Sequence, residues 1–341
     1  MNRSLILGAD VGGTYVKYAL GDGDEPGRWT GEVPSDPASP AITFGRLAAR
    51  VAELLPPDAG IGAAGLACAG IVDVRTGRLG RTPNLPGWEG ADLAGLMGVA
   101  FPGAAIALTN DVNAALAGEA RLGAGKDGGE REGGERGGGD LVMLALGTGV
   151  GGAVMIEGRL LVGHRFGAGE IGHMILDAAG PLCNCGNRGC LEAYAGSRGL
   201  LAAARRRAAA PDCSPGLRAL VAERGGELTT RDLAELATAS DLAAAALFRE
   251  AGERLGQAVG NLLNVLDPDL VIIGGGVAAA GELLLGPCRE TAARIVLCEA
   301  ARSTPIVPAR LGSSAAAFGA AHLAATHLAA IRLAAEARER S

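Results

Sequence analysis

Short apolar runs of strand length recur along the chain, and most of them end at Gly, Asp or Thr. They lie at residues 5–9, 15–20, 61–68, 105–108, 141–146, 153–156 and 269–273. Runs this short, bounded by turn-forming residues, are typical of buried strands. Longer segments at 42–55, 114–122, 193–207, 229–237, 240–266 and 313–338 carry apolar residues in patterns typical of helices. The mixture predicts an α/β protein.

Two of the strand ends carry a Gly/Thr turn. The first strand ends at Asp10-Val11-Gly12-Gly13-Thr14, and the strand at 141–146 ends at Gly147-Thr148-Gly149. Glycine lacks the Cβ that would keep a ligand away from the backbone amides, although the first turn alone is equally an ordinary tight turn. Two such turns, one in each half, predict an internal repeat whose hairpins face phosphate in a shared cleft. Neither is a P-loop, because the Gly-Lys-Ser/Thr ending is missing.

Three other segments carry residues that could contact a ligand. Asn110 and Asp111 stand where a strand gives way to a helix, so the pair can serve as a helix N-cap or carry a catalytic base. Asn84 lies between two prolines, in a solvent turn or a substrate contact. The glycines at 274–276 follow a buried strand, where bare backbone can lie against a flat ligand or simply make a crowded turn.

Composition narrows the class of protein. The chain has 341 residues, enough for two domains, with 48% hydrophobic residues and a net charge of −6. Nucleic-acid surfaces normally carry a basic excess, so we expect no nucleic-acid partner. No run approaches 18 uninterrupted strongly apolar residues, so we expect no membrane partner. Residues 123–139 are rich in Gly and charge and predict a flexible surface loop.

The strongest local signal is a cluster of zinc-type ligands. His173, Cys183, Cys185 and Cys190 fall within eighteen residues, with Glu170 just before them and Glu192 just after. Thiolate and imidazole are the ligands that zinc prefers, and four of them complete a tetrahedron with no open position for water. We therefore expect structural zinc, with the glycines at 186 and 189 in a tight knuckle that needs positive φ; the alternative is a chance cluster of thiols.

The remaining cysteines show no disulfide framework. Cys68, Cys213, Cys288 and Cys298 are scattered along the chain, and no signal peptide precedes the first strand. This usage favours a reducing, cytoplasmic location.

Taken together, the motifs resemble the ROK family (repressor, open reading frame, kinase), and within it the bacterial ATP-dependent glucokinases. The matching stretches are Asp10–Thr14, Pro83-Asn84, Asn110-Asp111, Leu146–Gly149, Glu170–His173, the cysteine knuckle that ends in Glu192, and Ile273–Gly276. The resemblance covers essentially the whole chain. Family members usually have Pro where this chain has Ala69, and their loop at 123–139 is shorter and less charged.

The resemblance implies an actin-like fold (the sugar kinase/Hsp70/actin, RNase H-like class): a duplicated two-domain α/β fold with an interdomain cleft. We expect a small N-terminal domain at 1–110, against which a C-terminal helix at about 315–341 packs. The large domain would span 111–314 and contain the zinc knuckle at 173–190. Family members are usually dimers or tetramers, so we expect a homodimer or homotetramer.

The resemblance also implies transfer of the ATP γ-phosphate to a hexose hydroxyl, the 6-hydroxyl if the sugar is glucose. Asp111 would be the general base, and Asp10 would hold Mg²⁺ through water. The expected contacts to ATP and its phosphates are Asp10, Gly12, Gly13, Thr14, Gly147, Thr148, Gly149, Gly274, Gly275 and Gly276. The expected contacts to the sugar are Asn84, Asn110, Glu170, His173 and Glu192. One imidazole nitrogen of His173 would bind zinc while the other faces the sugar.

Several alternatives stay open at this point. Kinases for fructose, mannose, allose, N-acetylmannosamine or N-acetylglucosamine share these motifs, and some relatives use polyphosphate, although those generally lack the cysteine knuckle. A sugar-responsive transcriptional regulator without its DNA-binding domain is a further alternative. Only four residues precede the first strand, and the chain is acidic, which disfavours it.

Overall fold

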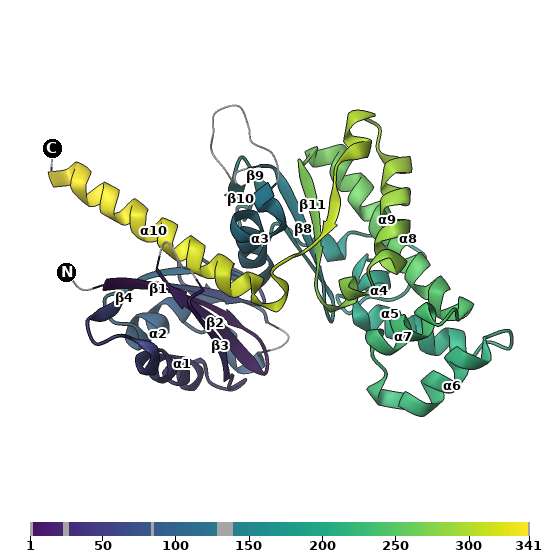
Figure 1. Cartoon of the computed structure of the whole chain (residues 1–341), viewed down its shortest axis with the longest axis horizontal. Coiled ribbons are helices and arrows are strands. Elements are labelled where there is room, and N and C mark those ends of the chain that lie inside the picture. Colours follow the sequence, from purple (N-terminus) through teal and green to yellow (C-terminus); the bar gives the residue numbers. More distant parts are fainter. Residues whose placement is uncertain (1–2, 23–26, 83–84, 128–138, 340–341) are drawn as a thin grey trace. The chain divides into compact units, whose positions relative to one another are not determined.

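The computed structural model describes residues 3–22, 27–82, 85–127 and 139–339. The chain divides into two compact units (Figure 1). Unit 1 comprises Met1–Lys126, Leu160–Ala168 and Leu311–Ser341, and unit 2 comprises Asp127–Arg159 and Gly169–Arg310. Strand order is β3-β2-β1-β4-β7 in one sheet and β10-β9-β8-β11-β12 in the other. The same order in both sheets confirms the predicted duplication.

Unit 1 has a five-stranded sheet with helices on both faces. The strands of this sheet are β1 (Arg3–Val11), β2 (Tyr15–Gly21), β3 (Trp29–Pro34), β4 (Ala59–Cys68) and β7 (Ala105–Asn110), while β5 (Val72–Asp73) and β6 (Arg78–Leu79) form a separate hairpin. The helices are α1 (Pro40–Leu54), α2 (Leu93–Ala100), α3 (Asp111–Leu122) and α10 (Ala315–Glu339). Strands β1, β4 and β7 are parallel, whereas β2 and β3 are antiparallel to their neighbours.

Residues of β1 alternate between the two faces of this sheet. Leu5 and Leu7 belong to the core that contains Phe44 of α1, whereas Gly8 faces α10. A Cβ at Gly8 would collide with the backbone carbonyl of Ala317 in α10, as one at Gly65 in β4 would with Ala320. Glycine at both positions therefore lets the backbone of α10 lie directly on the sheet.

The second sheet belongs to unit 2 and is covered by the long pair α8 and α9. The strands are β8 (Leu141–Leu146), β9 (Val150–Ile156), β10 (Arg159–Leu160), β11 (Leu270–Gly274) and β12 (Ile306–Pro308); the helices are α4 (Glu192–Ala195), α5 (Ser197–Ala208), α6 (Pro215–Arg224), α7 (Thr230–Thr238), α8 (Leu242–Leu266) and α9 (Glu282–Ile295). Buried residues of β8, β11, α8 and α9 form one apolar core. Strand β8 is parallel to β11, and β11 to β12, as in unit 1.

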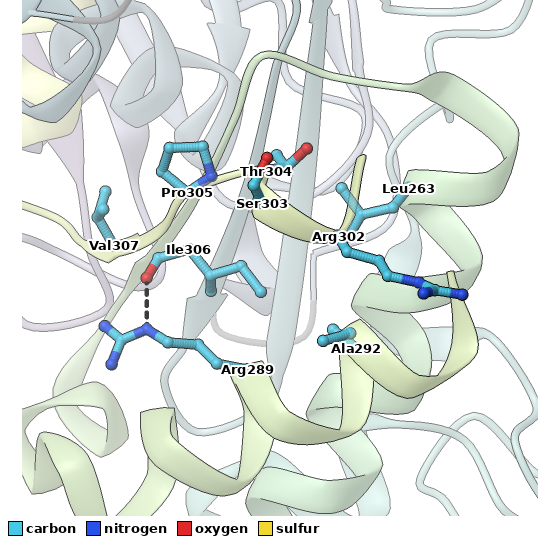
Figure 2. Close-up of a pocket in the computed structure, with 10 residues that line it drawn as sticks. Leu263, Arg289, Ala292, Arg302, Ser303, Thr304, Pro305, Ile306 and Val307 are labelled. Carbon is cyan, nitrogen blue, oxygen red and sulfur yellow. Dashed lines mark hydrogen bonds between the residues drawn. The ribbon is translucent and has the colours of Figure 1, made fainter. Parts of the chain in front are cut away.

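Strand β12 is the edge of this sheet, and its outer side is covered by an arginine. Arg289 of α9 donates from Nε to the carbonyl of Ile306 at 2.9 Å, while its Nη1 pairs with Glu282 at 2.8 Å (Figure 2). Pro308 has no N–H to offer a further strand. A cavity of about 400 Å³ lies beside β12, and Figure 2 shows the Arg289 and Arg302 guanidinium groups directed away from each other there. The edge is thus closed to further pairing by contacts within unit 2.

The structure corrects the expected domain boundary at residue 110. Helix α3 belongs to unit 1, so the first crossing between the units falls after Lys126, and residues 160–168 also belong to unit 1. The reason is a close contact between α3 and α10, where Gly118 abuts the carbonyl of Ala315 and Gly319 abuts that of Ala114. The sequence does not reveal a contact between segments 200 residues apart.

Two helix boundaries also differ from those predicted. The segment at 193–207 is two helices, α4 and α5, separated by Gly196. Asp241 rather than Ser240 caps α8, accepting hydrogen bonds from the N–H groups of Ala243 and Ala244, and Ser240 has a φ of 71°. Of the predicted flexible loop at 123–139, residues 128–138 lie outside the described residues.

Within the described residues, one helical segment is long and apolar enough to cross a membrane by length and composition alone. It is Gly312–Ala335, with a mean hydropathy of 1.3. Its alanines at 317, 320, 321 and 324 are buried in the protein, and its helix α10 contacts α3, β1 and β4 (Figure 1). Burial within unit 1 therefore accounts for the apolar character of these residues.

The close contact of α10 with the sheet predicts a strong difference between two glycine substitutions. Gly65→Ala would place a methyl group against the carbonyl of Ala320, and we expect it to lower the free energy of unfolding by about 2–3 kcal/mol. The matched control is Gly45→Ala on the exposed side of α1, where a Cβ meets nothing within 4 Å. Because alanine favours helix, the control should raise stability by about 0.5–1 kcal/mol. Equal effects of both variants in urea unfolding would contradict the packing.

Candidate active site and metal centre

Asp10 and Asp111 lie at the carboxyl ends of the parallel strands of unit 1. Asp10 is the second-last paired residue of β1, with Ala67 of β4 beside it and Thr109 of β7 beyond that. Asp111 lies two residues after Thr109 in the sequence, directly after the end of β7. The carboxyl edge of a parallel sheet is where α/β proteins place ligand-binding groups. Two predicted site residues, 100 positions apart in sequence, thus meet at one edge.

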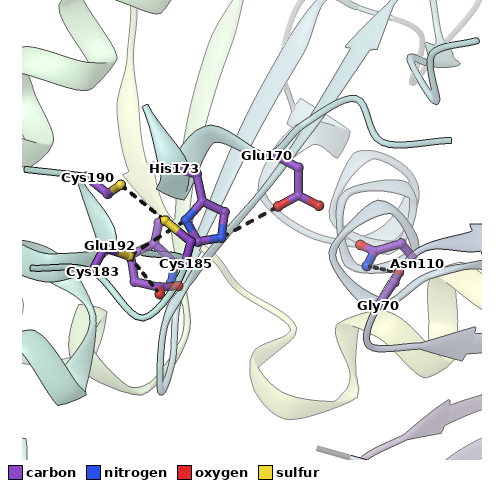
Figure 3. A network of polar contacts seen from close by, with 9 residues as sticks. Gly70, Asn110, Glu170, His173, Cys183, Cys185, Cys190 and Glu192 are labelled. Atoms are coloured by element: carbon purple, nitrogen blue, oxygen red, sulfur yellow. Dashed lines mark hydrogen bonds and ion pairs between the residues drawn. The ribbon is translucent and has the colours of Figure 1, made fainter. Parts of the chain in front are cut away.

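Asn110 and Asp111 start helix α3 and are held by local hydrogen bonds. The Asn110 Oδ1 accepts from the N–H of Val112 at 2.9 Å and of Asn113 at 3.3 Å, so Asn110 is the N-cap. Its Nδ2 donates to the carbonyl of Gly70 at 3.1 Å (Figure 3). The Asp111 Oδ1 accepts from the N–H of Val112 at 3.0 Å. Since an amide has two N–H groups, Asn110 keeps one for a ligand.

The pKa values of Asp10 and of the nearby Cys68 thiol are both raised. Burial raises the pKa of Asp10 from 3.8 to about 7, the charge of Asp111 adds to the rise, and Lys17 opposes it. Burial also raises the pKa of the Cys68 thiol to about 12, with Asp111 and Asp10 contributing. The side chains of Asp10, Asp111 and Cys68 therefore lie close together in a largely buried region. Such a place is suited to a cation, which would offset the repulsion.

The Gly12–Thr14 turn is closed by backbone contacts. The N–H of Gly12 donates to the carbonyl of Tyr15 at 3.0 Å. Ser35, directly after β3, holds the turn from outside: its Oγ donates to the carbonyl of Gly12 at 2.8 Å, and its N–H donates to that of Thr14 at 2.9 Å. The turn is thus shaped by its neighbours before any ligand binds.

The glycine turns of unit 2 occupy the equivalent edge of the second sheet. The N–H of Gly147 donates to the carbonyl of Gly149 at 2.9 Å, and Gly274 is aligned with Ala145 across β11 and β8. Gly275 has a φ of 87°, and a Cβ there would collide with the backbone of Leu146. The structure therefore brings the Gly147–Gly149 and Gly274–Gly276 turns together at one sheet edge.

The four expected zinc ligands converge. One ligand atom from each of His173, Cys183, Cys185 and Cys190 lies within 4.8 Å of all the others (Figure 3). The Cys185 and Cys190 Sγ atoms are 3.6 Å apart, and the Cys183 Sγ lies 3.8 Å from the His173 Nδ1. Zinc–sulfur bonds of about 2.3 Å in a tetrahedron separate two sulfurs by about 3.8 Å, so the donor set fits zinc.

The knuckle backbone has the predicted tight turns. Gly186 has a φ of 94° and Gly189 a φ of 69°, which confirms the need for glycine at both positions. The N–H of Gly186 donates to the carbonyl of Cys183 at 3.0 Å, and the N–H of Cys183 donates to that of Asn187 at 2.8 Å. The Asn187 backbone N–H lowers the pKa of Cys185 to about 7, which favours a thiolate ligand at neutral pH.

The carboxylates on either side of the knuckle differ in their contacts. Glu170 is exposed, and its Oε2 lies 4.0 Å from the His173 Nε2, the ring nitrogen turned away from Cys183. Glu192 is half-buried: its Oε2 accepts from the N–H of Val150 at 3.1 Å, and its Oε1 lies 3.5 Å from the Cys183 Sγ. Glu192 therefore contacts both the knuckle and the Gly147–Gly149 turn.

The predicted site residues thus form two groups, one in each unit. Asp10, the Gly12–Thr14 turn, Asn110 and Asp111 gather in unit 1. The zinc ligands, Glu170, Glu192 and both glycine turns gather in unit 2. Asn84 lies outside the described residues. Unit 1 supplies a carboxylate pair for a cation or a proton, and unit 2 supplies backbone amides for anionic groups.

Sequence reasoning missed four residues that matter locally. Lys17 is the direct cross-strand neighbour of Asp10, and Ser35 holds the first glycine turn. Glu119 of α3 is fully buried and accepts from the N–H groups of Ala124 at 2.8 Å and Leu311 at 2.7 Å. Asn113 has a buried Oδ1 with no partner among the described residues. A charged residue inside an apolar helix was the available signal for Glu119.

Comparison with known proteins agrees with this geometry. The ROK family model matches residues 6–327. A glucokinase of Thermotoga maritima is 32% identical over 333 residues, 95% of this chain and 98% of that protein. The solved ROK family glucokinase of Streptomyces griseus, in complex with glucose and AMPPNP, is 30% identical with a TM-score of 0.74, covering 95% of this chain and 100% of that one. A xylose repressor of Caldicellulosiruptor bescii is 30% identical over 68% of this chain and 54% of that protein.

The matched residues lie in both units of the chain. The family match alone spans well over half of the sequence. The chain belongs to the ROK family, and its fold is the actin-like, duplicated α/β fold.

Proposed function

We propose that this chain is a hexokinase-type phosphotransferase that transfers the γ-phosphate of ATP to the 6-hydroxyl of glucose. The observation that supports it most directly is the carboxylate pair, Asp10 and Asp111, at one sheet edge of unit 1. Relatives of nearly the same length, similar from end to end, are glucokinases. A cytoplasmic setting, where ATP and reduced thiols are present, suits the reaction.

Asp111 is the general base in this proposal. The hydroxyl oxygen attacks the γ-phosphorus, its bond to phosphorus forms as the bond from the γ-phosphorus to the β,γ-bridging oxygen breaks, and the hydroxyl proton goes to the Asp111 carboxylate. The Val112 N–H donates to one Asp111 carboxylate oxygen at 3.0 Å and so helps to hold the side chain in place. Positioning and charge neutralisation supply most of the acceleration in phosphoryl transfer, so Asp111 mainly orients the hydroxyl.

Asp10 would hold Mg²⁺ through water, and the cation would neutralise phosphate charge. Burial and, to a smaller extent, the Asp111 charge raise the pKa of Asp10, and a cation would offset both effects. The amides of the Gly12–Thr14 and Gly147–Gly149 turns, with the hydroxyls of Thr14 and Thr148, hold phosphates. The bare backbone at 274–276 lies against adenosine.

Sugar hydroxyls need directional partners, which carboxylates, amides and imidazole supply. Glu170, Glu192 and the Nε2 of His173 take part in unit 2, and Asn110 contributes its remaining N–H. Asn84 completes the set. Structural zinc fixes the ring orientation of His173 and takes no part in the chemistry.

The proposal predicts ATP-dependent turnover with glucose at the highest kcat/KM in a panel of fructose, mannose, N-acetylmannosamine and N-acetylglucosamine. Asp111→Asn keeps the shape of the side chain and an acceptor for Val112, and should reduce kcat by 10²–10⁴-fold while leaving the fold intact. Coupled assays with ATP and with polyphosphate measure both. Glucose binding without any turnover would point to a sugar-responsive regulator, and an Asp111→Asn variant with more than about a hundredth of the wild-type kcat would remove Asp111 as base.

The zinc assignment predicts a selective effect of one cysteine. Cys185→Ser should lose most bound zinc and raise the KM for glucose by about tenfold, because His173 is no longer held. The matched control is Cys298→Ser, which changes an exposed cysteine outside the cluster and should leave both unchanged. The zinc content is measured by mass spectrometry, and the KM for glucose is measured by steady-state kinetics. A zinc-free Cys185→Ser enzyme with normal KM would rule out the orienting role.

The raised pKa of Asp10 predicts a pH-dependent stability. Between pH 3.8 and about 7 the folded chain keeps a proton that the unfolded chain releases, so Asp10 lowers stability as pH rises through this window. The full cost is at most about 4 kcal/mol. In EDTA, Asp10→Asn should therefore raise the melting temperature at pH 8 more than at pH 5, and exposed Asp58→Asn should not. A gain that is the same at both pH values would contradict this origin.

A further inference from the structure

Glu192 connects two parts of unit 2 that the proposed function treats separately. Its Oε2 accepts from the N–H of Val150 at 3.1 Å, directly after the Gly147–Gly149 turn. Its Oε1 lies 3.5 Å from the Sγ of the zinc ligand Cys183. The two oxygens of one side chain therefore reach the residue after the Gly147–Gly149 turn and the knuckle, and Figure 3 shows Glu192 beside Cys183.

The space at Gly149 is shaped around this carboxylate. A Cβ at Gly149 would collide with the Glu192 Oε2, and the three nearest atoms it would meet all belong to the Glu192 side chain. At Gly147 a Cβ would meet nothing within 4 Å. Glycine at position 149 is therefore required by Glu192, and not only by an approaching ligand.

The backbone that carries Glu192 supports the same turn. Glu192 is the first residue of α4, and α5 starts five residues later. The N–H of Ser197 donates to the carbonyl of Gly147 at 2.9 Å, and that of Arg198 donates to Thr148 at 3.3 Å. On the other side, the N–H of Leu191 donates to the carbonyl of Met174, next to the ligand His173, at 3.0 Å. One short segment, 191–198, thus joins the metal centre to the turn.

We propose that Glu192 is a positioning residue for the phosphate donor: it holds the Gly147–Gly149 turn through Val150 and ties the conformation of that turn to the zinc knuckle. A carboxylate acceptor makes a stronger hydrogen bond than a neutral one, and it limits how far the turn can open. The inference rests on the proposed function only in naming ATP as the ligand of the turn. The coupling itself is a property of unit 2 alone.

The coupling is tested without any ligand by hydrogen exchange of the peptide that spans residues 147–151. Glu192→Ala should speed exchange of the Val150 amide at least tenfold, since it loses its acceptor. Glu192→Gln keeps an oxygen acceptor and should stay within about threefold of wild type. Cys185→Ser should also speed exchange, although it touches neither Glu192 nor Val150. Unchanged exchange in Glu192→Ala overturns the proposal.

Nucleotide binding in the absence of sugar gives the functional readout. Glu192→Ala should raise the Kd for MgADP by about tenfold, and Glu192→Gln should bind MgADP almost as tightly as the wild type. Glu170→Ala removes the other carboxylate beside the knuckle, which lies next to His173, and should leave MgADP binding unchanged. Equal weakening by Glu170→Ala and Glu192→Ala overturns the positioning role. Absence of MgADP binding in the wild type refutes the proposed kinase function instead, and the exchange result still decides the coupling.

A double substitution tests the steric part. Gly149→Ala should lower the melting temperature in the wild-type background and cost much less in Glu192→Ala, where the colliding atoms are gone. Gly147→Ala should show no such dependence on residue 192. An additive Gly149→Ala and Glu192→Ala pair overturns the close packing on which the proposal depends.

Discussion

Two carboxylates, Asp10 and Asp111, share a partly buried edge of one sheet, and most of unit 1 serves to hold them there. Burial, with the Asp111 charge adding to it, raises the pKa of Asp10 to about 7. The fold tolerates this because each carboxylate has a separate support: Asp10 lies within the β1 ladder, and Asp111 begins a helix whose N-cap is hydrogen-bonded to Gly70. A group held at such a cost is an expected feature of a functional site rather than of a stable core.

Unit 2 repeats the strand order of unit 1, and both units carry a glycine turn after their first strand. Unit 1 adds the carboxylates of Asp10 and Asp111, whereas unit 2 adds a second glycine turn, in which Gly275 lies against Leu146. Backbone amides attract anions without carrying a net charge, so they do not pay the repulsion seen at Asp10. Duplication thus supplied two equivalent edges, and the side chains at each determine which charge the edge attracts.

Much of this organisation could be predicted from the sequence, because strand runs and glycine turns are local signals. The candidate zinc site could be predicted for the same reason: His173 and the three cysteines lie within eighteen residues, and their ligand atoms lie close together in the structure. The domain boundary was not readable, since α3 joins unit 1 through Gly118 and Gly319, which only the folded chain brings together. Glu119, whose partners include Leu311 almost 200 residues away, was missed for that reason.

Glu192 shows a different limit of sequence reasoning. Its place after the knuckle suggested one role, a sugar contact, whereas in the structure one of its oxygens accepts a hydrogen bond from Val150 and the other lies beside the Cys183 Sγ. A carboxylate has about four acceptor positions, so these contacts and a sugar hydroxyl are compatible. In the proposed enzyme the knuckle has a reason to be rigid, because a change in orientation at Cys183 would displace both the proposed sugar contact and the Gly147–Gly149 turn. Zinc would prevent such a change, because one ion would fix four side chains in one short segment.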